Sequence, residues 1–128
     1  MTEDKILIVD DEKAILLLLE KMFSKAGYKV RTSTSGKAAL ALLENEEVQV
    51  IFSDLNMPDM NGLELCRKIK KERPMTILYA MTGYASLFEL ADCRDAGFED
   101  YFNKPMKLKV LLKAAQDAFN RIDRWRKG

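Results

Sequence analysis

The chain has 128 residues, 48% of them hydrophobic, and its 21 basic side chains nearly balance 20 acidic ones. This length fits one domain with a sizeable core, and a net charge of +1 creates no global attraction to nucleic acid or anionic lipid. The absence of histidine excludes Ser-His-Asp and Cys-His catalysis, histidine-ligated zinc and imidazole acid–base chemistry.

Membrane and secretory signals are also missing. The longest apolar runs, among them Ala14 to Leu19, are far shorter than the ~18 residues that a membrane span needs. The N-terminal MTEDK has no basic region followed by an apolar one, and Cys66 and Cys93 show no CxxC spacing. We therefore expect a reduced, cytoplasmic protein that does not contact membranes.

Short apolar segments alternate with helical ones through the first half of the chain. KILIVDD predicts a strand at residues 5–9, and residues 12–26 are typical of a helix that ends at Gly27. YKVRTS predicts a strand at 28–33, and the Ser- and Thr-rich cluster after it supplies an N-cap for a helix at 37–45.

The second half continues this alternation. Its predicted elements are, in order, a strand at 48–53, a helix at 62–73, a strand at 75–81, a helix at 86–97, a strand at 100–102 and a helix at 106–126. Such regular alternation favours a parallel sheet with helices on both faces, and continuous apolar strands such as ILIV and VIF agree with it. We expect one α/β domain over residues 1–128, with a flavodoxin-like fold and the strand order 2-1-3-4-5.

Polar side chains stand at the ends of four predicted strands. In order along the chain they are Asp10 and Asp11, then Asp54, Thr82 and Lys104. Ligands of doubly wound sheets bind at the carboxyl ends of the strands. The order 2-1-3-4-5 makes these four strands neighbours and leaves the second strand, which ends in small turn residues, at the edge.

This set of side chains suits phosphoryl transfer. Three converging carboxylates raise one another's pKa unless a cation offsets them, and oxygen ligands with few protein groups suit Mg²⁺. Lys104 adds a fixed positive charge and Thr82 a hydroxyl donor. An Asp carboxylate can itself be the nucleophile, and Asp54, alone at the end of a central strand, is the best placed of the three.

Taken singly, these residues have simpler interpretations, although a cap does not explain two adjacent aspartates that face a third at another strand end. Asp10 or Asp11 precedes a helix and could only cap it, Thr82 could be a turn hydroxyl, and Lys104 a solvated lysine. The Asn61-Gly62 pair predicts a turn in which Gly62 adopts backbone angles that other residues avoid.

Four segments resemble the receiver domain of two-component response regulators, the CheY-like family: LIVDDE, SDLNMPDMNGLEL, MTGY and AGFEDYFNKP. The resemblance implies that Asp54 accepts a phosphoryl group from a partner's phosphohistidine. It implies that Asp11, Asp54, the backbone carbonyl of Asn56 and, mainly through water, Asp10 hold Mg²⁺.

The same resemblance implies a switch. Thr82 matches the hydroxyl residue that moves to the phosphoryl group, Lys104 the lysine that pairs with phosphate, and Tyr101 the aromatic residue that turns inward. The bond from Lys104 to Pro105 is usually cis in this family, whereas Met106 departs from the aromatic residue that often follows. Asn56 and Tyr84 are expected to border the pocket and to tune hydrolysis of the phosphoaspartate.

The implied partners are a sensor histidine kinase or a histidine phosphotransferase as phosphoryl donor, and an output domain or protein, fused or separate. The domain itself is expected to bind no nucleic acid and to catalyse at most its own phosphorylation and dephosphorylation.

The first helix carries a candidate docking surface. Residues 14–19 are all apolar and cover its whole circumference, so some of them should be exposed, unless the helix lies deep between neighbours. We expect Ile15 and Leu18, together with Pro105 and Met106, to dock a helix of the phosphoryl donor.

The basic C-terminal stretch RIDRWRKG is interpreted as a solvated helix end, or as the point where Trp125 begins a linker.

Two other functions compete. A haloacid-dehalogenase-like phosphohydrolase also uses a strand-end Asp, Mg²⁺, a hydroxyl and a Lys, but it usually has a second Asp two residues after the nucleophile. Asn56 stands there after Asp54, and Glu12 after Asp10. Flavin binding on the same fold needs a loop rich in Ser, Thr and Gly after the first strand, where this chain has Asp-Asp-Glu.

Overall fold

The computed structural model describes residues 3–83 and 87–127, which form five strands and five helices in strict alternation. The strands are β1 (Lys5–Val9), β2 (Lys29–Ser33), β3 (Val50–Asp54), β4 (Ile77–Thr82) and β5 (Asp100–Asn103). The helices are α1 (Lys13–Lys25), α2 (Gly36–Asn45), α3 (Gly62–Glu72), α4 (Leu87–Ala96) and α5 (Leu108–Lys127).

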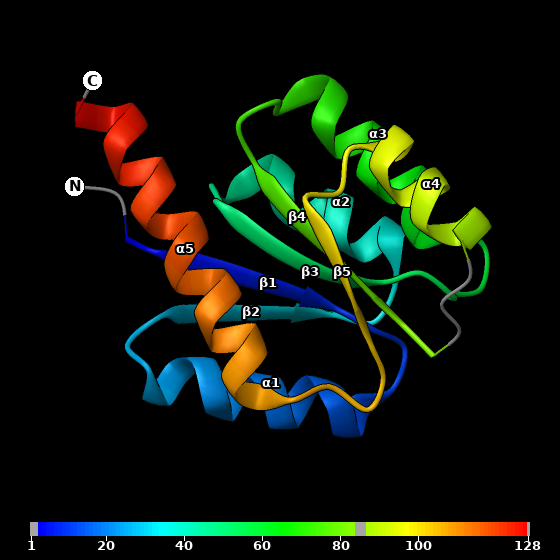
Figure 1. The fold of residues 1–128 in the computed structure, drawn as a ribbon, viewed down its shortest axis with the longest axis horizontal. Helices are drawn as coiled ribbons and strands as arrows, with labels where there is room; N and C mark the ends of the chain where they lie inside the picture. Colours follow the sequence, from blue (N-terminus) through cyan, green and yellow to red (C-terminus); the bar gives the residue numbers. More distant parts are fainter. Residues whose placement is uncertain (1–2, 84–86, 128) are drawn as a thin grey trace.

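All five strands are parallel and lie in the order β2-β1-β3-β4-β5 (Figure 1). This confirms the predicted doubly wound, flavodoxin-like fold. The expected elements are all present, and their bounds differ from the expected ones only at the ends. One difference matters for function, because Asp54 and Thr82 are the last residues of their strands and not the first residues of the following loops.

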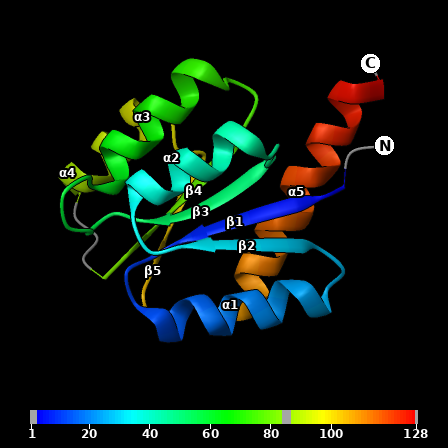
Figure 2. The same cartoon turned by 180° about the vertical axis from the view of Figure 1, so that it is seen from behind.

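Helices cover both faces of the sheet. α1 and α5 lie on one face, and α2, α3 and α4 lie on the other (Figures 1 and 2). Alternating side chains of each strand serve the two layers: Ile6 and Ile8 pack on the α1/α5 side, whereas Leu7 packs on the other. Both faces of the central strands are therefore buried, which explains their continuous apolar sequences.

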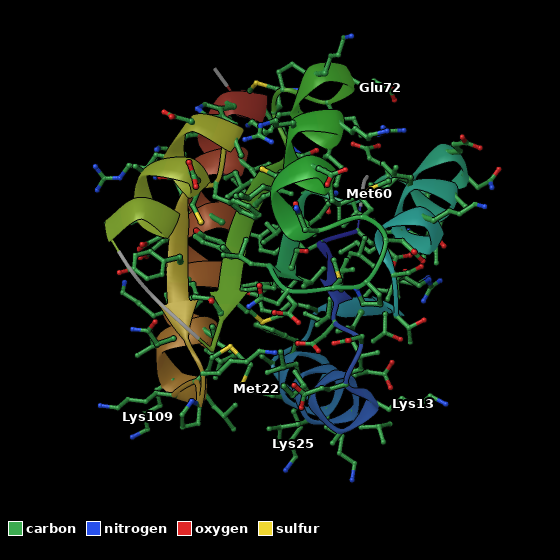
Figure 3. The ribbon with its side chains drawn as sticks, turned by 90° about the vertical axis from the view of Figure 1, so that its right-hand side faces the viewer. Lys13, Met22, Lys25, Met60, Glu72 and Lys109 are labelled. Carbon is green, nitrogen blue, oxygen red and sulfur yellow. The ribbon has the colours of Figure 1, made fainter. Side chains whose placement is uncertain are left out.

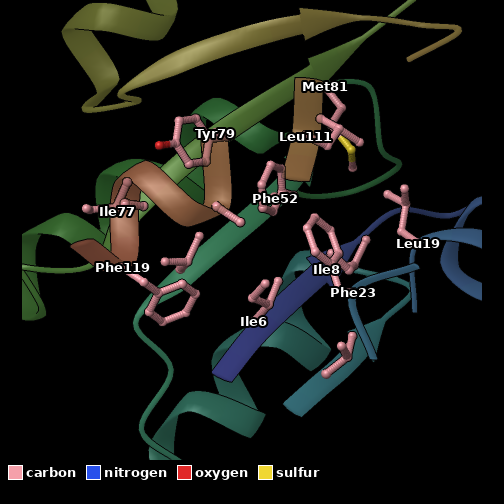
Figure 4. Close-up of a cluster of buried hydrophobic side chains, with 14 of the residues drawn as sticks. Ile6, Ile8, Leu19, Phe23, Phe52, Ile77, Tyr79, Met81, Leu111 and Phe119 are labelled. Atoms are coloured by element: carbon pink, nitrogen blue, oxygen red, sulfur yellow. The ribbon is translucent and has the colours of Figure 1, made fainter. Parts of the chain in front are cut away.

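Aromatic side chains pack among aliphatic ones in the layer between the sheet and the α1/α5 pair (Figure 4). Phe52 on β3 lies 5.2 Å from Phe23 of α1 and 5.0 Å from Tyr79 of β4, measured between ring centroids. The hydroxyl of Tyr79 donates a hydrogen bond to the carbonyl of Ala114 in α5, at 3.1 Å. Burial raises the pKa of Tyr79 to about 12, so this hydroxyl keeps its proton and fixes α5 on the sheet.

The orientation of α1 determines which residues of its apolar run, residues 14–19, are buried and which are exposed. Leu16 and Leu19 are buried against the sheet, whereas Leu17 is 63% and Leu18 52% exposed. The expectation of exposed leucines is confirmed, and the alternative of a helix sunk between its neighbours is wrong for these two.

The end of α1 and the start of α2 have the capping residues that the sequence predicts. Gly27 has a φ of 101° after α1, and the N–H groups of Gly27 and Tyr28 donate to the carbonyls of Ser24 and Phe23, which is a Schellman motif. At the start of α2, the Ser35 side chain accepts a hydrogen bond from the N–H of Ala38. Within the described part of the chain, no helix is long and apolar enough to cross a lipid bilayer.

Candidate functional site

Three carboxylates meet at the carboxyl edge of the sheet. β1 and β3 are neighbours with Val9 paired to Ser53, so Asp10 and Asp54, which follow these two residues, stand side by side. One carboxylate oxygen from each of Asp10, Asp11 and Asp54 lies within 4.8 Å of the others. Asp10 and Asp54 are buried and Asp11 is exposed, so the cluster opens to solvent on one side. Figure 3 views the molecule from this edge.

The carboxylate of Asp10 is held at both oxygens. Its Oδ1 accepts a hydrogen bond from the N–H of Glu12 at 2.9 Å, and its Oδ2 accepts one from Lys104 Nζ at 2.8 Å. The N-cap of α1 is Glu12, which makes no side-chain capping bond. Simple helix capping by Asp10 or Asp11 is therefore wrong, although Asp10 does fix the backbone that leads into the helix.

Asp54 is buried and only lightly restrained. Its Oδ1 accepts a hydrogen bond from the N–H of Asn56 at 3.3 Å, and its Oδ2 lies 3.6 Å from Lys104 Nζ. Burial and then the charge of Asp10 raise the pKa of this carboxyl, and Lys104 and the Asn56 N–H only partly offset them. A second cation at this edge would relieve the repulsion.

Lys104 brings its ammonium within 4 Å of both Asp10 and Asp54, the carboxylates at the ends of β1 and β3. Its backbone N–H donates to the carbonyl of Thr82 at 2.7 Å, which fixes the loop after β5 to the end of β4. Burial lowers the pKa of Lys104, but its hydrogen bond to Asp10 and the nearby carboxylates outweigh that effect, so the pKa is raised and the side chain stays charged.

Thr82 and Tyr101 flank this centre. Thr82 is buried at the end of β4, opposite Asn103 of β5. Tyr101 is half-buried on the edge strand and packs on the α2–α4 side of the sheet. Both lie where the sequence places them, whereas Tyr84 lies outside the described residues.

The loop after β3 presses closely on the strand end. The N–H of Leu55 donates to the carbonyl of Met81, and the N–H of Gly62 donates to the carbonyl of Leu55, both at 3.0 Å. A Cβ on Gly62 would collide with the carbonyl oxygen of Asp54 and stand 2.9 Å from the Cα of Leu55. Gly62 is needed for this close approach.

The reason expected for Gly62 was wrong. Among the described residues, only Asp59, Gly27 and Gly97 have positive φ, so Gly62 uses ordinary backbone angles. Sequence reasoning also missed Asn61, whose side chain accepts a hydrogen bond from the N–H of Glu64 and caps α3. Asn61 stands directly before that helix, a position that would have signalled its role.

Glu12 is a second residue that sequence reasoning missed. Its Oε1 lies 3.6 Å from Lys104 Nζ, so the ammonium is shared by three carboxylates, those of Asp10, Asp54 and Glu12. Glu12 is the last residue of the LIVDDE segment, but it lies beyond the strand end, and the predicted site residues were those at strand ends.

The predicted docking residues lie near this edge, at differing exposure. Leu18 and Pro105 are exposed, whereas Ile15 and Met106 are half-buried against the α1/α5 core. The bond between Lys104 and Pro105 is cis, as the resemblance implies. Because the outward face of α1 keeps an exposed leucine, the docking hypothesis stands as a prediction.

This arrangement can bind a divalent cation through oxygen atoms and present a buried carboxylate to an electrophile beside a fixed ammonium. Comparison with known proteins agrees. The sequence model of the response regulator receiver domain matches residues 6–116. A receiver domain from Methanospirillum hungatei superposes with a TM-score of 0.91 at 33% identity, over 99% of this chain and 100% of the other.

Two curated relatives carry the same module within longer proteins. The virulence sensor protein BvgS of Bordetella bronchiseptica is 36% identical over 121 residues, and the regulatory protein PhoP of Bacillus subtilis, named for alkaline phosphatase synthesis, is 30% identical over 121 residues. Each match covers 89% of this chain, but only 10% of BvgS and 50% of PhoP. The chain thus spans half or less of these relatives, and it belongs to the response regulator receiver domain family of two-component systems.

Proposed function

We propose that residues 1–128 act as one phosphoacceptor unit, in which Asp54 receives a phosphoryl group from a phosphohistidine of a sensor kinase or histidine phosphotransferase. The buried carboxylate of Asp54 beside Asp10, Asp11 and the Lys104 ammonium carries this proposal. An Asp54 oxygen attacks phosphorus, the P–N bond to the partner's imidazole breaks as the P–O bond forms, and the imidazole keeps the electron pair.

Mg²⁺ is the proposed cofactor. Asp11, Asp54 and the backbone carbonyl of Asn56 would hold it directly, and Asp10 mainly through water, because Lys104 and the N–H of Glu12 already occupy its oxygens. The oxygen-only donor set and its spacing fit a hard cation. When bound, the ion supplies positive charge that offsets the carboxylates and the transferring phosphoryl group.

The switch follows from charge. A phosphoryl group on Asp54 adds negative charge and strong acceptor oxygens within reach of Lys104, whose ammonium lies 3.6 Å from Asp54. Thr82, at the end of the next strand, supplies a hydroxyl donor, and its movement would leave space for half-buried Tyr101 to turn inward. The phosphoryl group thereby favours one of two pre-existing arrangements.

The output partner and the cellular setting of the domain are also part of this proposal. Relatives include a sensor protein and a transcriptional regulatory protein, so we propose an output domain or protein as the second partner, with no direct nucleic acid binding by this domain. Cys66 and Cys93 are buried free thiols, in keeping with a cytoplasmic setting.

The first prediction concerns phosphorylation itself. With a small phosphodonor and Mg²⁺, the wild-type chain is expected to gain one phosphoryl group by intact mass, and Asp54→Asn none. Removing Mg²⁺ with a chelator should abolish the gain. The haloacid-dehalogenase alternative has no support from the family match, and it predicts multiple turnover of diverse phosphate esters, which we do not expect.

The second prediction concerns the metal. At about 100 times its Kd, Mg²⁺ should raise the free energy of unfolding by about 2.7 kcal/mol, because it binds only the folded state. Replacing the exposed Asp11 with Asn should remove most of this increment and leave the fold intact. Thermal unfolding with Mg²⁺ and with chelator, for both proteins, checks this, and an equal increment in Asp11→Asn would contradict the proposed ligand set.

The third prediction concerns docking. Leu18→Asp is expected to slow transfer from a phosphohistidine donor on the order of tenfold or more, because it buries a charge in the interface. Labelling by a small phosphodonor should not change. Leu17 is the matched control, since it is equally apolar and 63% exposed but lies ~100° further round the helix. Equal losses for Leu17→Asp and Leu18→Asp would contradict the specific contact.

A further inference from the structure

Helix capping, metal binding and fold stability do not account for the side chain of Glu12. It makes no capping hydrogen bond at the start of α1. It is also not among the carboxylates whose oxygens lie within 4.8 Å of one another, which are those of Asp10, Asp11 and Asp54. The side chain is 62% exposed, and an exposed ion pair adds little to the stability of a fold. Its contact with Lys104 therefore needs a different explanation.

The backbone of Glu12 is fixed on both sides, so its side chain stays within reach of Lys104. The N–H of Glu12 donates a hydrogen bond to Asp10 Oδ1 at 2.9 Å. Its carbonyl accepts hydrogen bonds from the N–H groups of Ile15 and Leu16, at 3.1 and 3.2 Å. Lys104 is the one ion-pair partner of Glu12 within residues 3–83 and 87–127, at 3.6 Å between Oε1 and Nζ.

The ammonium of Lys104 is divided among carboxylates on different elements. It donates a short hydrogen bond of 2.8 Å to Asp10. Asp54 Oδ2 and Glu12 Oε1 each lie 3.6 Å from Nζ, which is too long for a hydrogen bond. These two carboxylates therefore attract the ammonium by charge alone. Glu12 does so from an exposed position, at the same distance as the proposed phosphoacceptor.

We propose that Glu12 is a positioning residue, which competes with the phosphoryl group on Asp54 for the ammonium of Lys104. This inference rests on the proposed phosphorylation of Asp54. A phosphoryl group adds negative charge and strong acceptor oxygens, so it draws the ammonium toward Asp54. The attraction of Glu12 opposes that movement and favours the resting arrangement. Glu12 thereby lowers the stability of the phosphorylated state and shifts the transfer equilibrium back toward the phosphohistidine donor.

Trifluoroberyllate is the probe for this competition, because the anion bonds to a carboxylate oxygen in place of a phosphoryl group. Isothermal titration calorimetry at saturating Mg²⁺ and fixed fluoride should give a Kd about threefold lower for Glu12→Gln than for the wild type, a gain in the range of one exposed ion pair. Glutamine keeps the length of the side chain and removes its charge. The urea midpoint should not change. An equal Kd for the two proteins overturns the proposal.

The matched control is Glu47→Gln, which removes the same charge near the start of β3, at the opposite end of that strand from Asp54. Glu47 is exposed and makes no ion pair in the described part of the chain. This variant should bind trifluoroberyllate like the wild type. Added NaCl should narrow the difference between Glu12→Gln and the wild type, because salt screens exposed charges. An equal gain in Glu47→Gln would reduce the effect to net charge and overturn the proposal.

A double-mutant cycle tests whether Glu12 acts through Lys104. In a Lys104→Met background, Glu12→Gln should lower the Kd little or not at all, because no ammonium remains to compete for. The same threefold gain in both backgrounds would mean direct repulsion of the anion and would overturn the positioning role. The comparison of Glu12→Gln with the wild type decides by itself if the Lys104 variant does not fold.

The same titrations separate this inference from the proposed function. A wild type that binds no trifluoroberyllate, or an Asp54→Asn variant that binds it equally well, would refute the phosphorylation of Asp54 and this inference with it. Binding that requires Asp54 but does not change in Glu12→Gln would refute the role of Glu12 alone.

Discussion

Lys104→Ala is expected to slow phosphorylation of Asp54 by about 10²–10³-fold and to destabilise the metal-free fold by about 3 kcal/mol. Both effects have one cause. The Lys104 ammonium lies 2.8 Å from the fully buried carboxylate of Asp10 and 3.6 Å from Asp54, so its removal leaves two buried negative charges without their cation. The rate falls because the same ammonium stabilises charge on the transferring phosphoryl group. Urea unfolding and phosphodonor kinetics measure the two effects.

Mg²⁺ and a neighbouring lysine provide the controls for this prediction. Saturating Mg²⁺ should return part of the lost stability, because it supplies positive charge at the same edge, but it should not restore the rate. Lys107→Ala removes an exposed lysine three residues away and should change stability by less than about 0.5 kcal/mol. If Lys104→Ala matched Lys107→Ala in both measurements, the ion pair with Asp10 would have no role.

Gly62→Ala is expected to destabilise the domain by about 1–3 kcal/mol and to lower the phosphorylation rate. The added methyl group would collide with the carbonyl oxygen of Asp54 and crowd the Cα of Leu55. Both obstacles are backbone atoms, so no side chain can rotate away, and α3 or the end of β3 must shift. Denaturant unfolding gives the stability loss, and phosphodonor labelling tests whether Asp54 has moved.

Gly83→Ala is the matched stability control, since a Cβ at Gly83 meets no atom within 4 Å and the residue has ordinary φ. It should change the free energy of unfolding by less than about 0.5 kcal/mol. A loss at Gly83 as large as that at Gly62 would show that the close approach to Asp54 is not the cause.

The fold and most of the candidate centre follow from sequence for a topological reason. In a parallel sheet, all strands end at the same edge, so Asp10, Asp54, Thr82 and Lys104 converge whatever the details of packing. The apolar strands and the glycines that end helices fix the elements within a few residues.

Other features depend on packing that no local pattern encodes. The rotation of α1 buries Leu16 and Leu19 and exposes Leu17 and Leu18, although the sequence offers a uniform apolar run. The sequence predicts a turn at Gly62, but the requirement for a residue without a side chain arises from the close approach of α3 to β3. The contact between Glu12 and Lys104 depends on the conformation of a long, exposed side chain.

The most direct test of the central claim locates the phosphoryl group after transfer from a phosphorylated histidine phosphotransferase in the presence of Mg²⁺. Reduction of the acyl phosphate with borohydride converts the modified aspartate into homoserine, which fragmentation mass spectrometry assigns to one residue. The proposed function predicts homoserine at position 54, and no conversion anywhere in Asp54→Asn. Conversion at another aspartate, or transfer to Asp54→Asn as fast as to the wild type, would contradict it.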